Sequence, residues 1–393
     1  MRKVEVVKGI YYVGCQDWNN RDFHGYNTPR GVTYNSYLIV DEKICLIDLV
    51  KEPFAQEFLD RVAAIVPLDK IDYVVMNHVE NDHASSLPLV MPHLKKDVEI
   101  YTSGPGARES QKLYGDYNYK VVKQGDSLKL GKNSLEFITL PMIHWPDSMA
   151  SYMPEQKILF SNDAFGQHYC TSNIFDDENN ISDVFHEAQK YYANILMLYS
   201  NLIEPATDKI SELAIDLICP SHGVIWRSNI AGILEKYRQW STHKNQDKIL
   251  VIYDTMWGAT EHMARMILEG AAAVPGVEAK LFKLPVNEKS HIVYELQDAV
   301  GVIFGSPTLN LGMLSTMGAF LTYVKGLKPV GKLATTFGTF GWSGGAQKDM
   351  EEFITKAGME LTEGLTCRWT ADKDELAACE KFGYEFALKA CKK

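Results

Sequence analysis

The chain has 393 residues, a length that fits two domains of roughly 100–200 residues each. Hydrophobic residues make up 46% of it and charged residues 23%, a globular balance that excludes a disordered or collagen-like chain. The 50 acidic residues outnumber the 40 basic ones and give a net charge of -10, which argues against nucleic acid as a partner.

The amino terminus and the cysteines predict a cytoplasmic protein. The first residues, MRKVEVVKGI, contain no apolar signal core, and no segment approaches the roughly 18 apolar residues of a membrane helix. The seven cysteines are scattered, with no C-x-x-C pair. We therefore expect no membrane attachment, no disulfide framework, and no built-in rubredoxin or zinc-ribbon module.

The first half of the chain predicts strands with helices on their faces. Residues 33–40 and 44–50 alternate like two strands, joined by a tight turn at 41–42. A helix is expected over 183–202. Four other segments are strongly apolar and run directly into polar residues, and the last of them could be partly helical; they are 71–76, 135–140, 157–160 and 213–218.

The second half predicts a doubly wound α/β domain with a parallel sheet. A helix over 228–240 precedes the polar segment STHKNQD, where we place the boundary between domains 1–245 and 246–393. Strands and helices alternate after it. We expect strands at 249–253, 279–284, 300–305 and 333–337, and helices at 261–273, 316–324 and 372–389.

The polar segment HVENDH, at residues 78–83, has a spacing typical of metal ligands. In an extended segment, residues two apart point the same way, so His78, Glu80 and Asp82 can converge on one side. His83 would turn in from the bend that follows. Taken alone, the segment could equally be a solvated polar loop.

Three other apolar segments also run into possible ligands, namely His144, Asp163 and His222. Open α/β layouts gather functional residues at the carboxyl ends of strands, so four such ends describe one pocket. With the first segment they supply seven ligands. That number suits two metal ions, with Asp163 as the residue that bridges them.

A hydroxyl-rich loop follows the first strand expected in the second domain. It offers backbone N–H groups, two threonine hydroxyls and a helix amino terminus to a phosphate, without the lysine of a Walker A motif. It resembles the flavodoxin phosphate loop, although a turn without function is the alternative. Its residues are Thr255, Met256, Trp257, Gly258, Ala259 and Thr260.

Two further loops of this domain resemble the ring-binding loops of flavodoxins. Their glycines let backbone N–H groups approach a flavin ring, and Trp342 offers an aromatic face. Because no G-x-G-x-x-G fingerprint is present, we expect FMN rather than FAD or NAD. The loops comprise Pro307, Thr308, Leu309 and Asn310, and Gly338, Thr339, Phe340, Gly341, Trp342, Ser343 and Gly344.

Taken together, these motifs resemble the flavodiiron proteins, also called A-type flavoproteins, over nearly the whole chain. Hydrolases that share the metallo-β-lactamase fold usually carry His-x-His-x-Asp-His and hold zinc, whereas this chain has Glu80 at the second histidine. An oxygen-rich ligand set suits iron better than zinc. The resemblance implies an N-terminal metallo-β-lactamase-like αβ/βα domain with two iron ions and a C-terminal flavodoxin-like domain with FMN.

The resemblance also assigns individual residues. In some members the histidine that matches His83 turns away, and water takes its place. His24 lies in a segment that resembles a pocket-lining loop, and Tyr192 resembles a pocket tyrosine, with plain packing as its alternative. For the remaining histidines, including His168, we expect a surface or locally hydrogen-bonded role. The assigned ligands are His78, Glu80 and His144 for the iron nearer the flavin, Asp82, His83 and His222 for the other, and Asp163 for both.

By resemblance, the protein reduces O2 to water, NO to N2O, or both, and its residues do not decide between the two gases. The chain ends shortly after the flavodoxin-like domain, so we expect a separate electron donor, either a rubredoxin or reduced coenzyme F420. The resemblance also implies a head-to-tail homodimer, or a tetramer built from such dimers.

Two other functions remain open at this stage. A binuclear zinc hydrolase with an FMN-binding regulatory domain would use the same fold, but Glu80 argues against zinc. A pure electron carrier would bind FMN and no metal, and the intact set of seven ligands argues against that.

Overall fold

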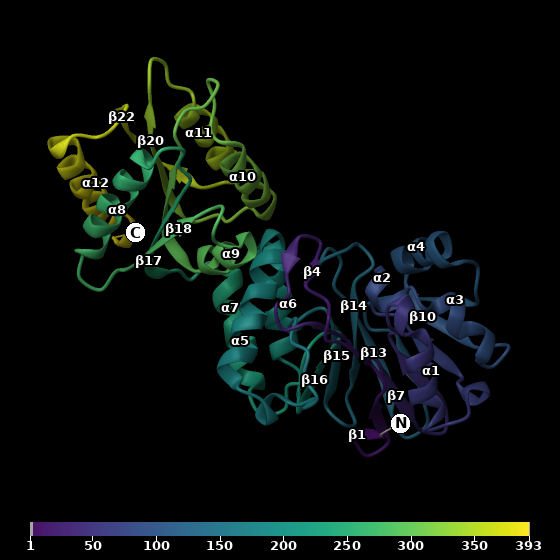
Figure 1. Cartoon of the computed structure of the whole chain (residues 1–393). Coiled ribbons are helices and arrows are strands. Elements are labelled where there is room, and N and C mark those ends of the chain that lie inside the picture. Colours follow the sequence, from purple (N-terminus) through teal and green to yellow (C-terminus); the bar gives the residue numbers. More distant parts are fainter. Residues whose placement is uncertain (1–2, 393) are drawn as a thin grey trace. The chain divides into compact units, whose positions relative to one another are not determined.

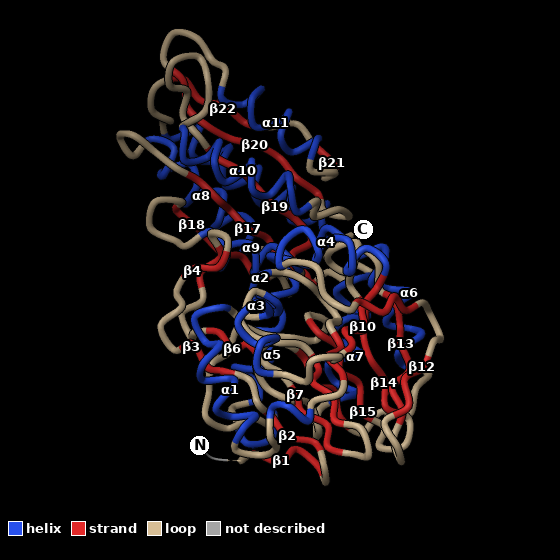
Figure 2. Tube along the Cα trace, turned by 90° about the vertical axis from the view of Figure 1, so that its right-hand side faces the viewer, coloured by secondary structure: helices blue, strands red, loops and turns tan. Residues whose placement is uncertain are grey.

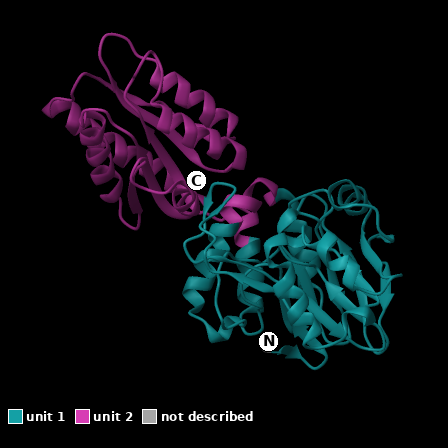
Figure 3. Ribbon diagram, turned by 45° about the vertical axis from the view of Figure 1, so that its right-hand side comes forward, with its two compact units in different colours: residues 1–191, 201–238 teal, residues 192–200, 239–393 magenta. Residues whose placement is uncertain are grey.

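The computed structural model describes residues 3–392, and its contacts divide the chain into two compact units (Figures 1 and 3). Unit 1 comprises Met1–Tyr191 and Asn201–Arg238, and unit 2 comprises Tyr192–Ser200 and Gln239–Lys393. No helix in the described part of the chain is long and apolar enough to span a membrane.

Unit 1 contains two mixed sheets that pack on each other, as the strands of Figure 2 show in red. The first sheet has the order β1-β2-β7-β8-β9-β10-β11 and the second β12-β13-β14-β15-β16. Two short ribbons, β3 with β6 and β4 with β5, complete the unit. The strands are β1 Val4–Val7, β2 Ile10–Tyr12, β3 Cys15–Asp17, β4 Asp22–Phe23, β5 Tyr26–Asn27, β6 Val32–Tyr34, β7 Tyr37–Val40, β8 Ile44–Ile47, β9 Tyr73–Val75, β10 Glu99–Ser103, β11 Tyr119–Val122, β12 Ser127–Lys129, β13 Ser134–Thr139, β14 Met149–Met153, β15 Ile158–Asn162 and β16 Leu217–Pro220.

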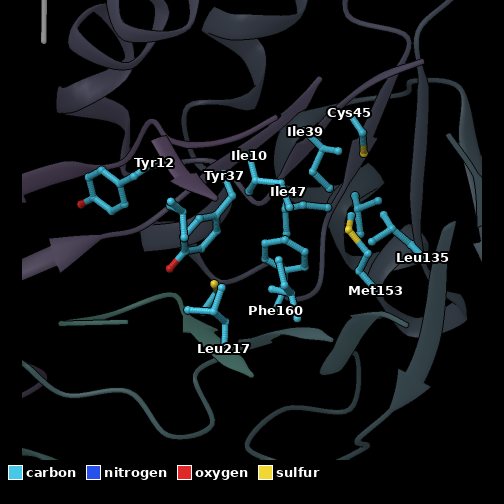
Figure 4. Packing of buried hydrophobic residues seen from close by; sticks show 14 of the residues in the cluster. Ile10, Tyr12, Tyr37, Ile39, Cys45, Ile47, Leu135, Met153, Phe160 and Leu217 are labelled. Carbon is cyan, nitrogen blue, oxygen red and sulfur yellow. The ribbon is translucent and has the colours of Figure 1, made fainter. Parts of the chain in front are cut away.

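Buried hydrophobic side chains fill the core between the two sheets (Figure 4). Ile39 and Ile47 enter it from the first sheet, and Leu135 and Phe160 from the second, and all four are fully buried. Alternate residues of a strand face the same side, so one face of each sheet supplies this core. Burial of these side chains stabilises the frame that carries the polar strand ends.

Helices cover the outer face of the first sheet. Phe58 and Val62 of α1 and Leu87 of α3 pack against Leu38 and Leu46 of that sheet. This helix-sheet-sheet arrangement confirms the predicted fold class for the first half of the chain. The α-helices formed in this half are α1 Ala55–Ala63, α2 Asn81–Ala84, α3 Leu87–Val90, α4 Gly104–Tyr114, α5 Ile181–Tyr191, α6 Ser200–Ser211 and α7 Ile230–Ser241.

The predicted hairpin at residues 33–50 is confirmed in part, since β7 pairs antiparallel with β8. The strand expected at 33–40 is broken, however, and its first part forms β6 in a different ribbon. The break falls at Asn35 and Ser36, whose side chains donate hydrogen bonds to backbone carbonyls of other segments. Polar side chains that bond elsewhere compete with continuous pairing of a strand.

The last apolar segment predicted in the first half, residues 213–218, forms a strand only at its end. Only its final residues belong to β16, which begins at Leu217, and α6 ends just before the segment. The helix expected over 183–202 begins as α5 and continues through the π-type turn Tyr192–Leu196 and the 3-10 turn Met197–Tyr199 into α6.

Unit 2 contains a parallel sheet with the order β18-β17-β19-β20-β21, and β22 also pairs with β20. The inner strand β17 is buried from Lys248 to Tyr253, as expected for a strand covered on both faces. The strand order is that of flavodoxin-like doubly wound folds, so the fold class predicted for the second half is confirmed. The strands are β17 Gln246–Tyr253, β18 Glu278–Lys283, β19 Ala299–Gly305, β20 Leu333–Phe340, β21 Glu360–Leu361 and β22 Leu365–Arg368.

The three helices predicted in this half are present, and two more lie between them. The unpredicted helices are α9, which Glu288 caps through the N–H groups of Ser290 and His291, and α11. The final helix starts with a capping box formed by Asp372 and Glu375. The helices of this half are α8 Ala259–Ala272, α9 Lys289–Gln297, α10 Ser315–Leu327, α11 Ala346–Lys356 and α12 Lys373–Cys391.

Candidate metal centre and flavin site

The structure brings the seven predicted metal ligands of unit 1 together. They form two groups whose ligand atoms lie within 4.8 Å of one another inside each group. His144 follows β13, Asp163 directly follows β15, and His222 follows β16. The groups are His78, Glu80, His144 and Asp163, and Asp82, His83 and His222.

The segment after β9 differs from the extended conformation that we expected. His78 and Glu80 precede α2, but Asp82 and His83 lie within its single turn. Glu80 has an extended backbone, with φ −59° and ψ 153°, and the helix starts at the next residue. This change of conformation sends His78 and Glu80 to one ligand group and Asp82 and His83 to the other.

The first group surrounds a point between four side chains. Glu80 Oε2 lies 3.3 Å from His78 Nε2 and 3.3 Å from His144 Nε2. Asp163 Oδ2 lies 3.2 Å from His144 Nε2 and 3.7 Å from His78 Nε2. Two imidazole nitrogens and two carboxylates therefore face one another in a nearly closed pocket.

Asp163 joins this group to the second one. Its other oxygen, Oδ1, lies 3.1 Å from His83 Nε2 and 3.5 Å from His222 Nε2. Asp82 approaches the same two nitrogens, at 3.4 Å from His83 and 3.1 Å from His222. The two oxygens of one carboxylate thus face two separate ligand groups, which is the arrangement required of a bridging ligand.

Several buried atoms of the cluster lack hydrogen-bond geometry despite these short separations. They include both carboxylate oxygens of Asp82, both ring nitrogens of His83, and Asp163 Oδ2. Buried polar atoms are rarely left unpaired, so atoms that face a common point need a partner there. Carboxylate oxygens and imidazole nitrogens suit iron, and the residues fit two metal ions.

The carboxylates and imidazoles of the first ligand group shift each other's pKa values. Burial would raise the pKa of Glu80, but hydrogen bonds from His144 and His78 outweigh it and hold that pKa well below its ordinary value. Burial lowers the pKa of His144, but Asp163 and Glu80 overcome this and raise it to about 9. Without metal, the protonated ring of His144 is thus paired with the carboxylates of Asp163 and Glu80, and a metal ion must displace its Nε2 proton.

Groups around the ligands fix the orientation of two imidazoles. His78 Nδ1 lies 2.8 Å from Asp147 Oδ2, and His222 Nδ1 lies 2.6 Å from the Thr33 carbonyl oxygen. The carbonyl can only accept, so Nδ1 of His222 donates this hydrogen bond, and its Nε2 faces the cluster. Such partners of the outer nitrogen commonly orient histidine ligands.

The two residues expected beside the ligands, His24 and Tyr192, lie in different units of the chain. His24 Nε2 lies 3.2 Å from Glu80 Oε1, at the edge of the cluster, and its side chain is 75% exposed. Tyr192 belongs to unit 2, where its hydroxyl bonds Ser200 and its ring packs on Trp240. These contacts lie within unit 2, and the place of Tyr192 beside the ligands stays a prediction.

The neighbouring Tyr191 and His168 do lie beside the ligands, and the sequence analysis missed both. Their ring centroids are 6.1 and 5.1 Å from that of His222. His168 is fully buried and neither of its ring nitrogens has a hydrogen-bond partner, contrary to the surface or hydrogen-bonded role that we expected. Burial holds the pKa of its ring well below the ordinary value. Its position five residues after Asp163, beyond the end of β15, was the available signal.

The hydroxyl-rich loop of unit 2 connects β17 to α8, as predicted. Thr255 Oγ1 accepts a hydrogen bond from the N–H of Gly258, and Gly258 has a φ of +89°, a conformation that favours glycine. The helix begins at the next residue. Thr260 is fully buried, and its hydroxyl lies 3.1 Å from that of Thr339 in the third loop.

A cavity of about 550 Å³ lies among the three predicted flavin-binding loops. Trp257 and Trp342 line it with side chains that are 95% and 81% exposed, which is typical of a surface that a ligand or partner covers. Leu311, Trp369 and Thr370 line it as well and were not predicted. The predicted residues on its wall are Thr255, Met256, Trp257, Ala259, Thr260, Pro307, Thr308, Leu309, Asn310, Thr339, Phe340, Gly341, Trp342 and Ser343.

Three of the predicted glycines do not line this cavity. Gly258 lies at the turn before α8, while Gly338 and Gly344 line a smaller pocket of about 120 Å³ that the third loop also borders. The size of the larger cavity and its mixture of hydroxyl groups, backbone and aromatic rings fit a flavin nucleotide.

Two family models match the chain. The model described as ODP family beta lactamase matches residues 32–223, and the flavodoxin model matches residues 251–383. The chain is 44% identical to a nitric oxide reductase of Moorella thermoacetica, over 98% of both chains. It is 39% identical to an anaerobic nitric oxide reductase flavorubredoxin of Escherichia coli, over 98% of this chain and 82% of that one.

Solved structures agree with these sequence relationships. The flavodiiron protein of Giardia intestinalis superimposes with a TM-score of 0.96 at 39% identity, covering 100% of this chain and 97% of that one. The rubredoxin oxygen:oxidoreductase of Desulfovibrio gigas gives a TM-score of 0.96 at 36% identity, covering 100% and 99%.

Proposed function

The chain belongs to the flavodiiron protein family, and from this premise we propose that it reduces oxygen, nitric oxide or both at a pair of iron ions, with electrons relayed through FMN. The observation that carries the proposal is the carboxylate of Asp163, whose two oxygens face two separate ligand groups. The family makes the chain an oxidoreductase. The gas, the donor and the roles of single residues are our inference.

The two ligand groups would each hold one iron ion. His78, Glu80 and His144 would bind the first, and Asp82, His83 and His222 the second, with Asp163 on both. The three loops of unit 2 would hold FMN, with Thr255 and Thr260 near its phosphate and Trp342 near its ring. Three carboxylates among seven ligands favour iron over zinc.

When bound, FMN and the iron pair would supply two electrons each, enough to reduce O2 to two waters and more than enough to reduce two NO to N2O and water. The residues of the chain would hold the ligand nitrogens in place and limit access of water. His78 and Asp163 are almost completely buried, while His144 remains partly exposed. The first group is therefore most open on the side of His144 and Glu80.

His24 is suited to carrying protons at the edge of the cluster. Its Nε2 contacts Glu80 Oε1, and its largely exposed ring is in reach of solvent. An imidazole in this position can pass a proton from water toward the ligand carboxylate. Both gas reductions consume protons, so such a group would serve either one.

The partners follow from the relatives and are proposals for this chain. The relatives named nitric oxide reductase support NO as a substrate, and the one named rubredoxin oxygen:oxidoreductase supports O2 and a rubredoxin donor. Reduced coenzyme F420 is the second donor that we propose. We also propose a cytoplasmic location and a head-to-tail homodimer in which the FMN of one chain serves the iron of the other.

Gas consumption by the reduced protein tests this function. Protein loaded with iron and FMN would be reduced without oxygen by an artificial donor in excess, and NO and O2 would be followed with electrodes. We expect rapid loss of at least one gas, and none with Asp163→Ala prepared identically. Loss of neither gas, with zinc bound instead of iron, would favour the hydrolase.

A further inference from the structure

The buried residue Asp254, directly after β17, contacts both ends of one of the flavin-binding loops. That loop, residues 306–314, connects β19 to α10, and we call it the ring loop. At its start, the N–H of Asp254 donates a hydrogen bond of 3.0 Å to the carbonyl of Gly305. At its end, the hydroxyl of Thr316, in the first turn of α10, donates to Asp254 Oδ2. Asp254 therefore brackets a loop to which it does not belong.

The other carboxylate oxygen of Asp254 holds the phosphate loop, residues 255–260 at the start of α8. Asp254 Oδ1 accepts a hydrogen bond of 2.7 Å from the N–H of Thr255, and the Thr255 hydroxyl in turn accepts one from the N–H of Gly258. Thr255 lines the cavity, whereas Asp254 does not. The carboxylate thus orients residues that would face a ligand without facing that ligand itself.

The ring loop is held in one conformation between its two ends. The N–H of Leu314 donates a hydrogen bond of 3.0 Å to the hydroxyl of Ser306, so the ends are joined directly. At the tip, Asn310 and Leu311 have φ values of 50° and 68°. Residues other than glycine keep such a conformation only where the surrounding structure imposes it. The position of the loop therefore depends on what holds its ends.

We propose that Asp254 is a positioning residue for FMN, which sets the spacing between the phosphate loop and the ring loop before the flavin binds. FMN carries its phosphate and its ring at opposite ends of one molecule, so both loops must be correctly placed at once. Groups that are already in place spare the ligand the cost of ordering them. This inference rests on the proposed function, which places the phosphate at the phosphate loop.

A purely structural tie makes a different prediction for FMN affinity. A hydrogen bond that is equally present in the free and the FMN-bound protein stabilises both, and its loss leaves the affinity unchanged. A tie that places the loops before binding is needed most in the free protein, where no flavin holds them together. Its loss must therefore weaken FMN binding, in addition to any loss of stability.

Three variants with matched controls test the proposal. Asp254→Ala removes both side-chain bonds, and Thr316→Val removes the bond to α10 with almost no change of shape. Asp254→Asn is the rescue variant, because its amide oxygen can accept from the Thr255 N–H and its amide N–H can donate to the Thr316 oxygen. The controls are Asp247→Ala, at an exposed aspartate at the opposite end of β17, and Thr322→Val, at an exposed threonine farther along α10.

Affinity for FMN and for riboflavin would be measured on the full-length protein by equilibrium dialysis, and stability by urea unfolding with and without FMN. We expect Asp254→Ala to bind FMN about 10-fold more weakly, the equivalent of one hydrogen bond to a carboxylate, and Thr316→Val to change the affinity in the same direction. Riboflavin, which lacks the phosphate, should lose less. Asp254→Asn should restore FMN affinity, and both controls should match the wild type.

Two results would overturn the inference alone. One is a wild-type affinity for FMN in both Asp254→Ala and Thr316→Val, whatever their stability. The other is an equal loss of affinity for FMN and riboflavin, because the tie would then not act on the spacing of the two loops. If Asp254→Ala does not fold, the result for Thr316→Val decides. A wild-type protein that binds neither flavin would instead overturn the proposed flavin site, and this inference with it.

Discussion

Asp163 is the residue on which the two ligand groups depend. Its Oδ2 faces His144 at 3.2 Å and its Oδ1 faces His83 at 3.1 Å, so its removal opens both groups at once. Its own position is fixed, because Ser221 donates a hydrogen bond to Oδ1 and Asn162 Oδ1 accepts one from its backbone N–H.

We expect Asp163→Ala to lose both iron ions and to keep FMN, because the flavin loops belong to unit 2. Metal affinity should fall by at least about 100-fold, the upper range for groups that only support ligands. Iron and FMN per chain would be measured on the purified protein. Asp97→Ala, at an exposed aspartate of the same unit, should keep both.

A substitution at Thr260 tests the proposed flavin site, as a substitution at Asp163 tests the metal site. The buried hydroxyl of Thr260 lies at the start of α8 and 3.1 Å from the Thr339 hydroxyl. Thr260→Val should weaken FMN binding about 3- to 10-fold, the equivalent of one hydrogen bond, and spare the iron. A fluorescence titration with FMN measures this, and the exposed Thr322→Val on α10 is the control. Equal affinities in both variants would show that the phosphate lies elsewhere.

Sequence alone could predict the seven residues that cluster in the structure, because each follows an apolar segment, but it could not identify their neighbours. His168 lies in a polar-looking stretch, and only the fold shows that Phe23, Tyr26 and Tyr191 enclose its ring. Sequence also could not decide which of Tyr191 and Tyr192 lies near the ligands. Adjacent residues of a helix point in different directions, and the turn in which α5 ends decides which one meets His222.

At the scale of elements, the parallel sheet of unit 2 was largely predictable, and α9 and α11 were not. The buried strands give continuous apolar segments, such as residues 249–253, whereas α11 is mostly polar and buries only Ala346, Met350 and Ile354. The extended conformation expected for residues 78–82 was wrong past Glu80, because a helical turn begins at Asn81 and includes Asp82, whereas a bend at His83 was expected.

Directly before strand β20 lies an unusual residue, the buried Lys332. Its amino group donates hydrogen bonds to Asn245 and to the carbonyls of Gln297 and Ala299. Burial lowers its pKa to about 7, against the attraction of Asp298 and with the repulsion of Lys248. The base of the sheet thus holds a lysine that is partly neutral near neutral pH.

This lysine predicts a pH dependence of stability. Between about pH 7 and its ordinary pKa of 10.5, Lys332 binds fewer protons in the folded than in the unfolded chain. The free energy of unfolding should therefore rise with pH in this window, by up to about 1.4 kcal/mol per pH unit from this residue. Denaturant unfolding of wild type and Lys332→Met at pH 7 to 10 measures the difference. Parallel pH profiles would contradict the lowered pKa.

At the scale of the whole molecule, the two redox sites belong to different units of the chain. The head-to-tail dimer that we propose would let the flavin of one chain serve the metal of another. In such a dimer, a chain without metal and a chain without flavin could together form one active pair of sites. Two independent monomers with the same defects would stay inactive.

A mixing experiment tests this arrangement. Asp163→Ala lacks the metal and keeps the flavin site, while Thr260→Asp places a charge against the flavin phosphate and keeps the metal site. Neither variant alone should reduce NO or O2. After dissociation and reassociation in equal amounts, we expect about one quarter of wild-type activity, the share given by random pairing of two subunits. If confirmed heterodimers recovered no activity, that result would contradict electron transfer from the FMN of one chain to the iron of the other.

We propose that seven side chains of unit 1 hold two iron ions with Asp163 between them. Diffraction from crystals of the iron-loaded protein, collected on both sides of the iron absorption edge, tests it most directly. We predict two iron peaks per chain, one among His78, Glu80 and His144, the other among Asp82, His83 and His222, and both bonded to Asp163. A single peak, or peaks that appear only at the zinc edge, would contradict the account.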